Sequence, residues 1–336
     1  MGLNGEAASA YDLAQIHAVE RMAIEGNSVF AWFYPPTYLL LILPLALLPY
    51  WAAWLAFMTT TLLPFWLLIR HMLAKSGGAI LVVAFPGLWV NLLHGQNAGL
   101  TTALVGTALL LLKQRPWIAG ILVALLSFKP HMVMMFPLVF LLTRSWRAAT
   151  SSMLSVLLLV LASTYLFGWS TWVGWQGGLQ TARELNENGS LAWAKMPTVF
   201  AGLRMQGAPI VWAYFGQLVS ALVAIYLMVR IWHRTNEIAL RGSAFVLATL
   251  LISPHFFDYD LLWLALPIAW LGARGLVFGW LRGERELLLI AWLLPMIGPV
   301  FAKVLGLQLM PLINLALLFL VWRKLRHGGS SSLATC

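Results

Sequence analysis

Residues 116–142 read PWIAGILVALLSFKPHMVMMFPLVFLL, two apolar runs that are separated by Phe128-Lys129-Pro130-His131. Each run, 116–127 and 131–142, would rise about 18 Å as a helix, which is less than the roughly 30 Å of a bilayer's hydrocarbon core. Irregular backbone inside a membrane occurs only where protein buries it or water reaches it. If the chain spans a membrane, the break therefore predicts two short helices that meet at a cavity.

The rest of the chain has the same apolar character. Hydrophobic residues make up 61% of it, charged residues 10%, and the mean hydropathy is +0.84, whereas about a quarter of the residues in an ordinary soluble domain are charged. This composition indicates an integral membrane protein. Because no polar block is long enough to fold separately, we expect residues 1–336 to form a single polytopic domain. Cys336, the only cysteine, excludes an intrachain disulfide.

Polar breaks divide the chain into an all-α arrangement of about eleven transmembrane helices, with short interfacial helices in the outer connections. The predicted spans are about 51–69, 79–93, 98–112, 116–127, 131–142, 148–168, 209–229, 242–253, 260–273, 287–301 and 306–322.

The charges predict the orientation of these spans. With residue 1 on the outer side, 15 of the 21 Lys and Arg residues fall in inner connections, whereas 8 of the 11 Asp and Glu residues fall outside. Short cytoplasmic loops are enriched in Lys and Arg. We therefore expect a multi-pass protein of the plasma (inner) membrane with a cytoplasmic C-terminus. The net charge of +10 is explained by topology, and nucleic-acid binding has no support.

The outer segment 1–36 is predicted to contain an amphipathic helix that lies on the membrane interface. Ser9 is in position to cap this helix, with Asp12 three residues later, and Gly26-Asn27 is a stop signal. This spacing favours a capping role for Asp12 over a catalytic one. A short apolar helix, 37–48, follows.

Three short outer connections bring ionisable or amide side chains to the ends of apolar spans, where such groups are costly and tend to be functional. Each also has a structural interpretation: helix capping for the first and third, and a lysine that extends to the membrane interface for the second. The residues are His94, Gln96 and Asn97; Lys129 and His131; and His255, Asp258 and Asp260.

The longest outer connection, 169–208, is predicted to be a loop. It contains Gly, Ser and Asn together with tryptophans, whose rings either belong to an interfacial aromatic belt or stack on a sugar ring. These are Trp169, Trp172, Trp175 and Trp193.

Motifs of soluble enzymes are missing from the sequence. It has no Gly-rich phosphate loop, no HExxH and no serine nucleophile elbow. The outer histidines are too scattered to predict a metal site, and nothing supports a nucleotide cofactor. We therefore expect neither metal nor cofactor.

Several short motifs together carry a family resemblance. In their order and spacing they resemble the polytopic glycosyltransferases of family 87, the polyprenol-phosphate-mannose-dependent mannosyltransferases of the GT-C superfamily. The motifs are Ala7-Ala8-Ser9-Ala10-Tyr11-Asp12, Phe33-Tyr34-Pro35-Pro36, Leu43-Pro44-Leu45-Ala46, Gly95-Gln96-Asn97, Lys129-Pro130 and Ser253-Pro254-His255.

The resemblance implies a reaction and a set of partners. A hexose, mannose in the family, would pass from a polyprenyl-phosphate carrier to a lipid or glycan acceptor on the outer side, with inversion. A carboxylate would accept the proton of the acceptor, and cationic or hydrogen-bonding groups would hold the departing phosphate. An apolar groove between spans would bind the polyprenyl tail. Membrane lipids would be further partners of the protein. The expected substrate-binding residues are Lys129, His131, His94, Gln96 and His255.

One feature departs from the family pattern. The resemblance implies a further N-terminal span, followed at once by an acidic residue that serves as the base, whereas this sequence starts inside that outer loop. We therefore expect a truncated or mis-started form whose catalytic base is unknown. The candidates are Asp12 and Asp258, with Glu6 and Glu20 behind them. A secondary transporter and a non-catalytic paralogue of the transferase stay open as alternatives.

Overall fold

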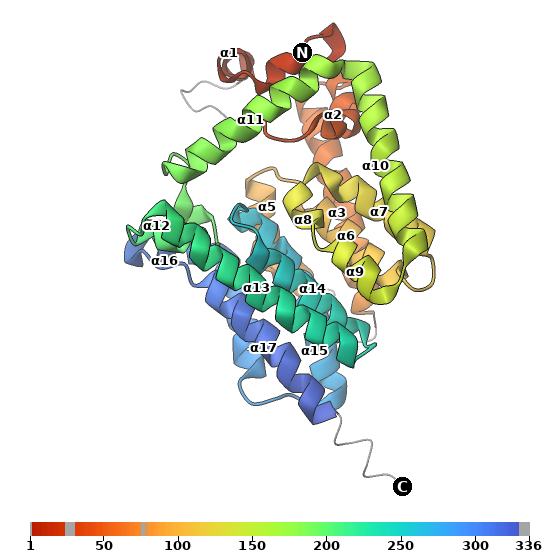
Figure 1. Ribbon diagram of the computed structural model, residues 1–336, viewed down its shortest axis with the longest axis vertical. Helices are drawn as coiled ribbons and strands as arrows, with labels where there is room; N and C mark the ends of the chain where they lie inside the picture. Colours follow the sequence, from red (N-terminus) through yellow and green to blue (C-terminus); the bar gives the residue numbers. More distant parts are fainter. Residues whose placement is uncertain (1, 24–30, 75–77, 79, 329–336) are drawn as a thin grey trace.

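The computed structural model describes residues 2–23, 31–74, 78 and 80–328, and within these ranges the chain is helical and contains no strand (Figure 1). In the described chain, 5 helices are long and apolar enough to cross a membrane. They are α3 (Tyr50–Met72), α10 (Trp146–Phe167), α13 (Ile210–Arg234), η6 with α15 (Asp258–Phe278) and α16 (Glu284–Leu305). The all-helical membrane architecture is confirmed, whereas the count of eleven spans stays a prediction.

The remaining apolar helices are shorter or lie toward the C-terminus. They include α2 with η3 (Pro36–Leu47), α6 (Ala98–Leu111), α14 (Ile238–Ile252) and α17 (Met310–Gly328). One predicted span, 79–93, is not a single helix: it is divided into α4 (Ile80–Ala84) and α5 (Pro86–Leu93). The division lies at Phe85, whose extended backbone is the conformation that a following proline favours.

The break in the opening stretch is confirmed. The segment 116–143 folds as α7 (Pro116–Leu125), η4 (Leu126–Phe128), α8 (Pro130–Val133) and α9 (Phe136–Thr143). Lys129 lies between η4 and α8 with φ −118° and ψ 76°, outside the helical region. Pro130, which has no N–H to donate, starts α8 at its first position. The local backbone therefore turns at Lys129.

The N-terminal segment differs from its predicted capping pattern. The helix α1 (Leu13–Ala23) begins later than expected, because Asp12 Oδ1 accepts hydrogen bonds from two backbone N–H groups of its first turn at 2.9 and 3.0 Å. Ser9 lies instead in a 3-10 turn, η2 (Ala7–Tyr11). The prediction that Ser9 caps the helix is wrong, and Asp12 is the cap. Gly26-Asn27 lies outside the described residues.

The long outer connection 169–208 is mostly helical, and its place on the outer side stays a prediction. It contains α11 (Trp169–Glu187), followed by η5 (Trp193–Lys195) and α12 (Val199–Met205). Tertiary packing explains the helix, since Gly174 and Gly178 let the ring of Tyr11 in η2 approach its backbone closely. Trp175 Nε1 also donates to the carbonyl of Phe33 at 3.1 Å. These contacts attach α11 to the N-terminal segment.

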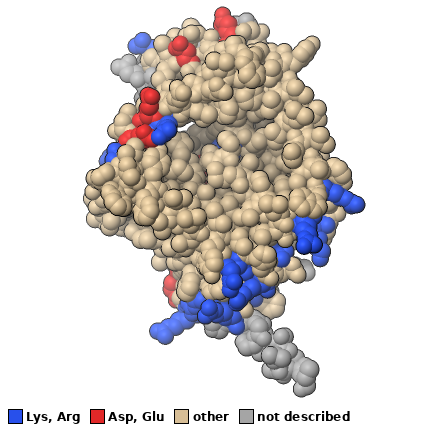
Figure 2. Space-filling model, in the orientation of Figure 1, with Lys and Arg blue, Asp and Glu red and all other residues tan. Residues whose placement is uncertain are grey.

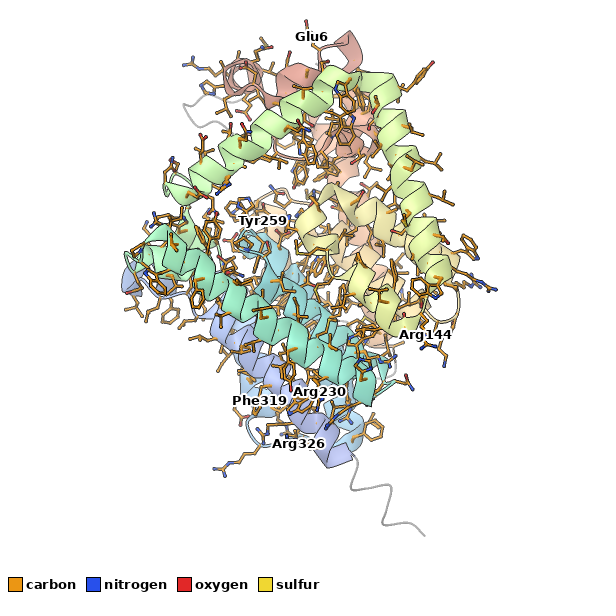
Figure 3. The ribbon with its side chains drawn as sticks, in the orientation of Figure 1. Glu6, Arg144, Arg230, Tyr259, Phe319 and Arg326 are labelled. Carbon is orange, nitrogen blue, oxygen red and sulfur yellow. The ribbon has the colours of Figure 1, made fainter. Side chains whose placement is uncertain are left out.

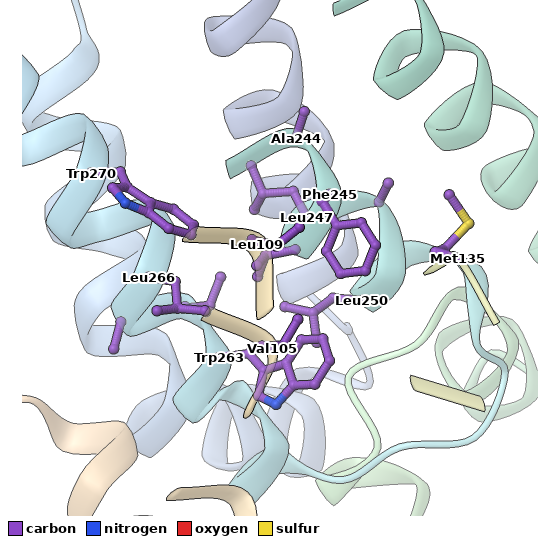
Figure 4. Packing of buried hydrophobic residues seen from close by; sticks show 14 of the residues in the cluster. Val105, Leu109, Met135, Ala244, Phe245, Leu247, Leu250, Trp263, Leu266 and Trp270 are labelled. Atoms are coloured by element: carbon purple, nitrogen blue, oxygen red, sulfur yellow. The ribbon is translucent and has the colours of Figure 1, made fainter. Parts of the chain in front are cut away.

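Buried side chains from α6, α14 and α15 form the centre of the hydrophobic core, with Trp263 of η6 among them (Figure 4). Trp263 is fully buried, and its Nε1 donates to Thr101 Oγ1 of α6 at 2.9 Å. In Figure 1, α10, α11 and α13 frame one face of the molecule, and α8 and α5 lie between them. The core thus supports η6, which begins within this frame.

The contact between α7 and α10 gives a first prediction. A Cβ at Gly120 of α7 would overlap Ser151 Oγ and the backbone oxygen of Ala148 on α10. We expect Gly120→Ala to lower the free energy of unfolding by about 1–3 kcal/mol, because the helices must separate. Chemical denaturation in detergent measures it. Gly177→Ala on α11 is the control, since no heavy atom lies within 4 Å of its Cβ position. Equal losses for both variants would contradict the prediction.

Candidate active site

A buried ion pair lies where α7 and α8 meet. Lys129 Nζ is 2.6 Å from Asp260 Oδ1, and the side chains are 4% and 3% exposed. Lys129 Nζ also lies 5.3 Å from the centroid of the Tyr259 ring. The interpretation of Lys129 as a lysine that extends to the membrane interface is therefore wrong. Its charge is matched inside the protein by a carboxylate from η6.

Two histidines lie beside this pair. His131 Nε2 is buried and has no hydrogen-bond partner among the described residues. Burial lowers the pKa of His255, and the opposing effect of Asp260 is smaller. A pKa below the ordinary value of about 6.5 favours the neutral imidazole at pH 7. It can donate a hydrogen bond to a ligand but does not supply a positive charge.

Two tyrosines of the FYPPTY stretch are fixed by the GQN turn. Asn97 Nδ2 donates to Tyr34 Oη at 3.1 Å and to Tyr38 Oη at 2.9 Å, and Tyr34 Oη donates to Gln96 Oε1 at 3.2 Å. The Tyr38 ring stacks on Phe128, with centroids 4.4 Å apart. The side chain of Asn97 makes no capping bond to α6, so its interpretation as an ordinary cap is wrong. Three separate sequence motifs thus form one cluster.

The outer edge of the cluster carries a second set of polar groups. Lys195 Nζ donates to His94 Nε2 at 3.3 Å, and His94 Nδ1 donates to the Val90 carbonyl at 2.8 Å. Asp258 is 3% exposed and accepts a hydrogen bond from the backbone N–H of Tyr259 at 2.9 Å. His94 and Lys195, both exposed, are close enough to act electrostatically on Asp258. Two potential phosphate ligands therefore accompany a carboxylate.

Tyr259, the chain neighbour of Asp258, lies near an opening of the molecule. Figure 3 shows Tyr259 between α8, α11 and α13, and Figure 2 shows a hollow in the same face below α11, with charged side chains at one edge. Asp258, an exposed lysine and an exposed histidine lie close together beside Tyr259, and such a group of side chains can bind a phosphate and accept a proton.

A model of glycosyltransferase family 87 matches residues 32–254. The match includes the FYPP, GQN and Lys129-Pro130 motifs of the cluster, and covers well over half of the chain. The chain belongs to glycosyltransferase family 87. No curated protein and no solved structure matched it. It is therefore a membrane glycosyltransferase by family, and the matched region ends at Pro254, just before His255 and the aspartates.

The other carboxylates considered for this glycosyltransferase lie in the N-terminal segment. Asp12 is exposed and caps α1, and no contact joins it to the cluster. Glu6 lies at the end of the molecule that is remote from Tyr259 (Figure 3). The structure thus brings Asp258, and neither of these residues, to the opening.

Sequence reasoning missed several members of the glycosyltransferase cluster. Asp260 was interpreted as either a functional residue or a helix cap, and its pairing with Lys129 was not predicted. No motif or spacing in the sequence indicated a functional role for Lys195, which is a single lysine between Trp193 and Met196. Tyr34 belonged to a recognised motif, but only the structure shows its hydroxyl bonded to the GQN turn.

An apolar groove of about 500 Å³ lies between α3, α4, α15 and α16. It reaches Phe85 at the start of α5, whereas His94 follows the end of α5, about 13 Å farther along that helix. The groove is lined by Ile69, Leu73, Gly78, Leu81, Val82, Phe85, Ala265, Ile268, Ala269, Gly272, Ala273, Leu276, Trp280, Leu288, Leu289 and Trp292.

Proposed function

We propose that this chain transfers a hexose, mannose in our first assignment, from a polyprenyl-phosphate carrier to a lipid or glycan acceptor on the outer side of the plasma membrane. The observation that carries the proposal is the meeting of Asp258, Lys195 and His94 at one opening. Figure 2 supports the orientation, because Lys and Arg gather at the opposite end, which we assign to the cytoplasm together with the C-terminus.

Asp258 is the proposed general base. The acceptor hydroxyl oxygen attacks the anomeric carbon, the bond from that carbon to the phosphate oxygen breaks, and polyprenyl phosphate leaves with the electron pair. Asp258 takes the acceptor's proton, and one displacement inverts the anomeric centre. Asp260 is less suited to this role, because its charge is already matched by Lys129 at 2.6 Å.

Lys195 and His94 are the proposed ligands of the departing phosphate, where they would stabilise its growing negative charge. The ion pair of Lys129 and Asp260 holds the tyrosines and the η6 turn in place, with His131 and His255 beside it. Gln96 acts through its hydrogen bond to Tyr34. The apolar groove along α15 and α16 is the proposed site of the polyprenyl tail.

The alternatives have less support. A secondary transporter would place its ionisable groups near the middle of paired broken helices, and the family match is with glycosyltransferases. A non-catalytic paralogue would have no reason to keep a carboxylate, a lysine and a histidine close together.

Lys195→Ala tests the assignment. In proteoliposomes containing the full chain and polyprenyl-phosphate-linked [14C]mannose, we expect the KM for the donor to rise roughly tenfold to a hundredfold, as for loss of a charged hydrogen bond. Lys113→Ala, an exposed lysine beyond α6, is the control. If the two variants have the same KM for the donor, the phosphate binds elsewhere. If [14C]mannose enters the vesicles and no product forms, the protein is a transporter.

A further inference from the structure

The opposite end of the molecule has a cluster of arginines around one indole ring. The guanidinium carbons of Arg230 and Arg234 in α13 lie 5.9 and 5.0 Å from the ring centroid of Trp322 in α17, and that of Arg326 lies 5.6 Å from it. Arg230 also lies 5.9 Å from the ring of Tyr226. Figure 3 shows Arg230 and Arg326 at this end, where α13 and α17 terminate.

These arginines have no acidic partner in the described chain. None of the three lies within 4.0 Å of a carboxylate there, although all three are exposed. Neighbouring carboxylates are already paired: Glu284 with Lys324 at 2.7 Å, and Glu237 with Arg274 at 2.8 Å. Three guanidinium carbons within 5.9 Å of one ring centroid repel one another, because their separations are of the order of the Debye length of about 8–10 Å. A bound anion would relieve this repulsion.

The surface next to the arginines indicates the kind of anion. Toward the middle of the helices, the same side of α13 exposes Tyr226 (60%) and Leu222 (58%), and α17 exposes Phe319 (53%). Polarity therefore changes along the helix axes from guanidinium through aromatic to aliphatic side chains. A phospholipid has the same order, with a phosphate at the interface and acyl chains below it.

We propose that Arg230, Arg234 and Arg326 bind the phosphate of an anionic phospholipid, with Trp322 between them and the acyl chains along Leu222 and Phe319. Guanidinium groups suit this role because their planar donors match phosphate oxygens. The site is distinct from the proposed transfer site. Arg230 and Arg234 lie at the C-terminal end of α13, Arg326 lies at the C-terminal end of α17, and both ends are away from Tyr259 (Figure 3).

Native mass spectrometry of the detergent-purified full chain tests the proposal, with phosphatidylglycerol, phosphatidylcholine and inorganic phosphate as probes. We expect R230Q/R234Q/R326Q to raise the apparent Kd for phosphatidylglycerol at least tenfold and to leave phosphatidylcholine binding unchanged. The matched control, K113Q/R115Q/R147Q, removes three exposed charges from the connection before α7 and from the first turn of α10, and should bind phosphatidylglycerol as the wild type does.

Three outcomes would overturn the proposal. If the control variant loses as much affinity for phosphatidylglycerol as the triple variant, the effect comes from the net charge of the protein and not from this site. If the wild type binds phosphatidylcholine as tightly as phosphatidylglycerol, the site does not select a lipid with a net negative charge. Displacement of the lipid by inorganic phosphate at similar concentration would indicate a site for soluble anions. If the triple variant does not fold, R234Q replaces only the arginine nearest the ring and should still raise the Kd for phosphatidylglycerol several-fold. An unchanged Kd in R234Q would reject the site.

Discussion

Asp258→Asn is expected to reduce sugar transfer by about 10²–10⁴-fold, the range contributed by a general base. Asparagine keeps the size and the hydrogen bond from the backbone N–H of Tyr259, but it does not accept the acceptor's proton. Because His94 and Lys195 remain, binding of the donor should change little. Single-turnover product formation at saturating donor measures the loss, and equilibrium binding of the labelled donor checks that the site is intact.

Asp12→Asn is the matched control for this prediction, since Asp12 is the other aspartate that the sequence analysis considered as the base. Its carboxylate is exposed and caps α1, so we expect its transfer rate to stay within about twofold of the wild type. If Asp258→Asn retains more than about a tenth of the wild-type transfer rate and Asp12→Asn falls below that level, the base lies in the N-terminal segment instead.

Local backbone structure was predictable from the sequence where a single residue determines the backbone conformation. The break before Pro130 follows from the missing N–H of proline, and the two short helices follow from the length of the apolar runs. Capping was harder. Ser9 and Asp12 are both good caps, and the sequence does not say which one has its side chain turned to the first free N–H groups.

Contacts between distant segments were not predictable, and they make the site. The pairing of Lys129 with Asp260 spans 131 positions, and no periodicity links the two residues. Helix α11 was missed for a related reason, because its glycines favour a loop until the packing against Tyr11 is known. The motifs therefore showed which residues matter, but the partners of those residues come from the fold.

Lys129→Ala is expected to destabilise the protein by about 3–5 kcal/mol, because it leaves the buried carboxylate of Asp260 without a partner. Replacing both residues with apolar ones, as in K129M/D260L, should recover most of this loss. Thermal unfolding in detergent and a double-mutant cycle measure the coupling. Additive losses from the two single variants would contradict a direct interaction.

The double variant also separates two roles for Lys129. If the pair only positions the tyrosines and the η6 turn, K129M/D260L should lower kcat and leave the donor KM unchanged. If Lys129 instead holds the phosphate, the donor KM should rise as it does for Lys195→Ala. The second buried pair of the chain, Lys324 with Glu284, is the control, because K324M/E284L alters a similar pair at the other end of the molecule. A rise in donor KM in that control would mean that loss of any buried pair distorts the site, and Lys129 would then have no special place in it.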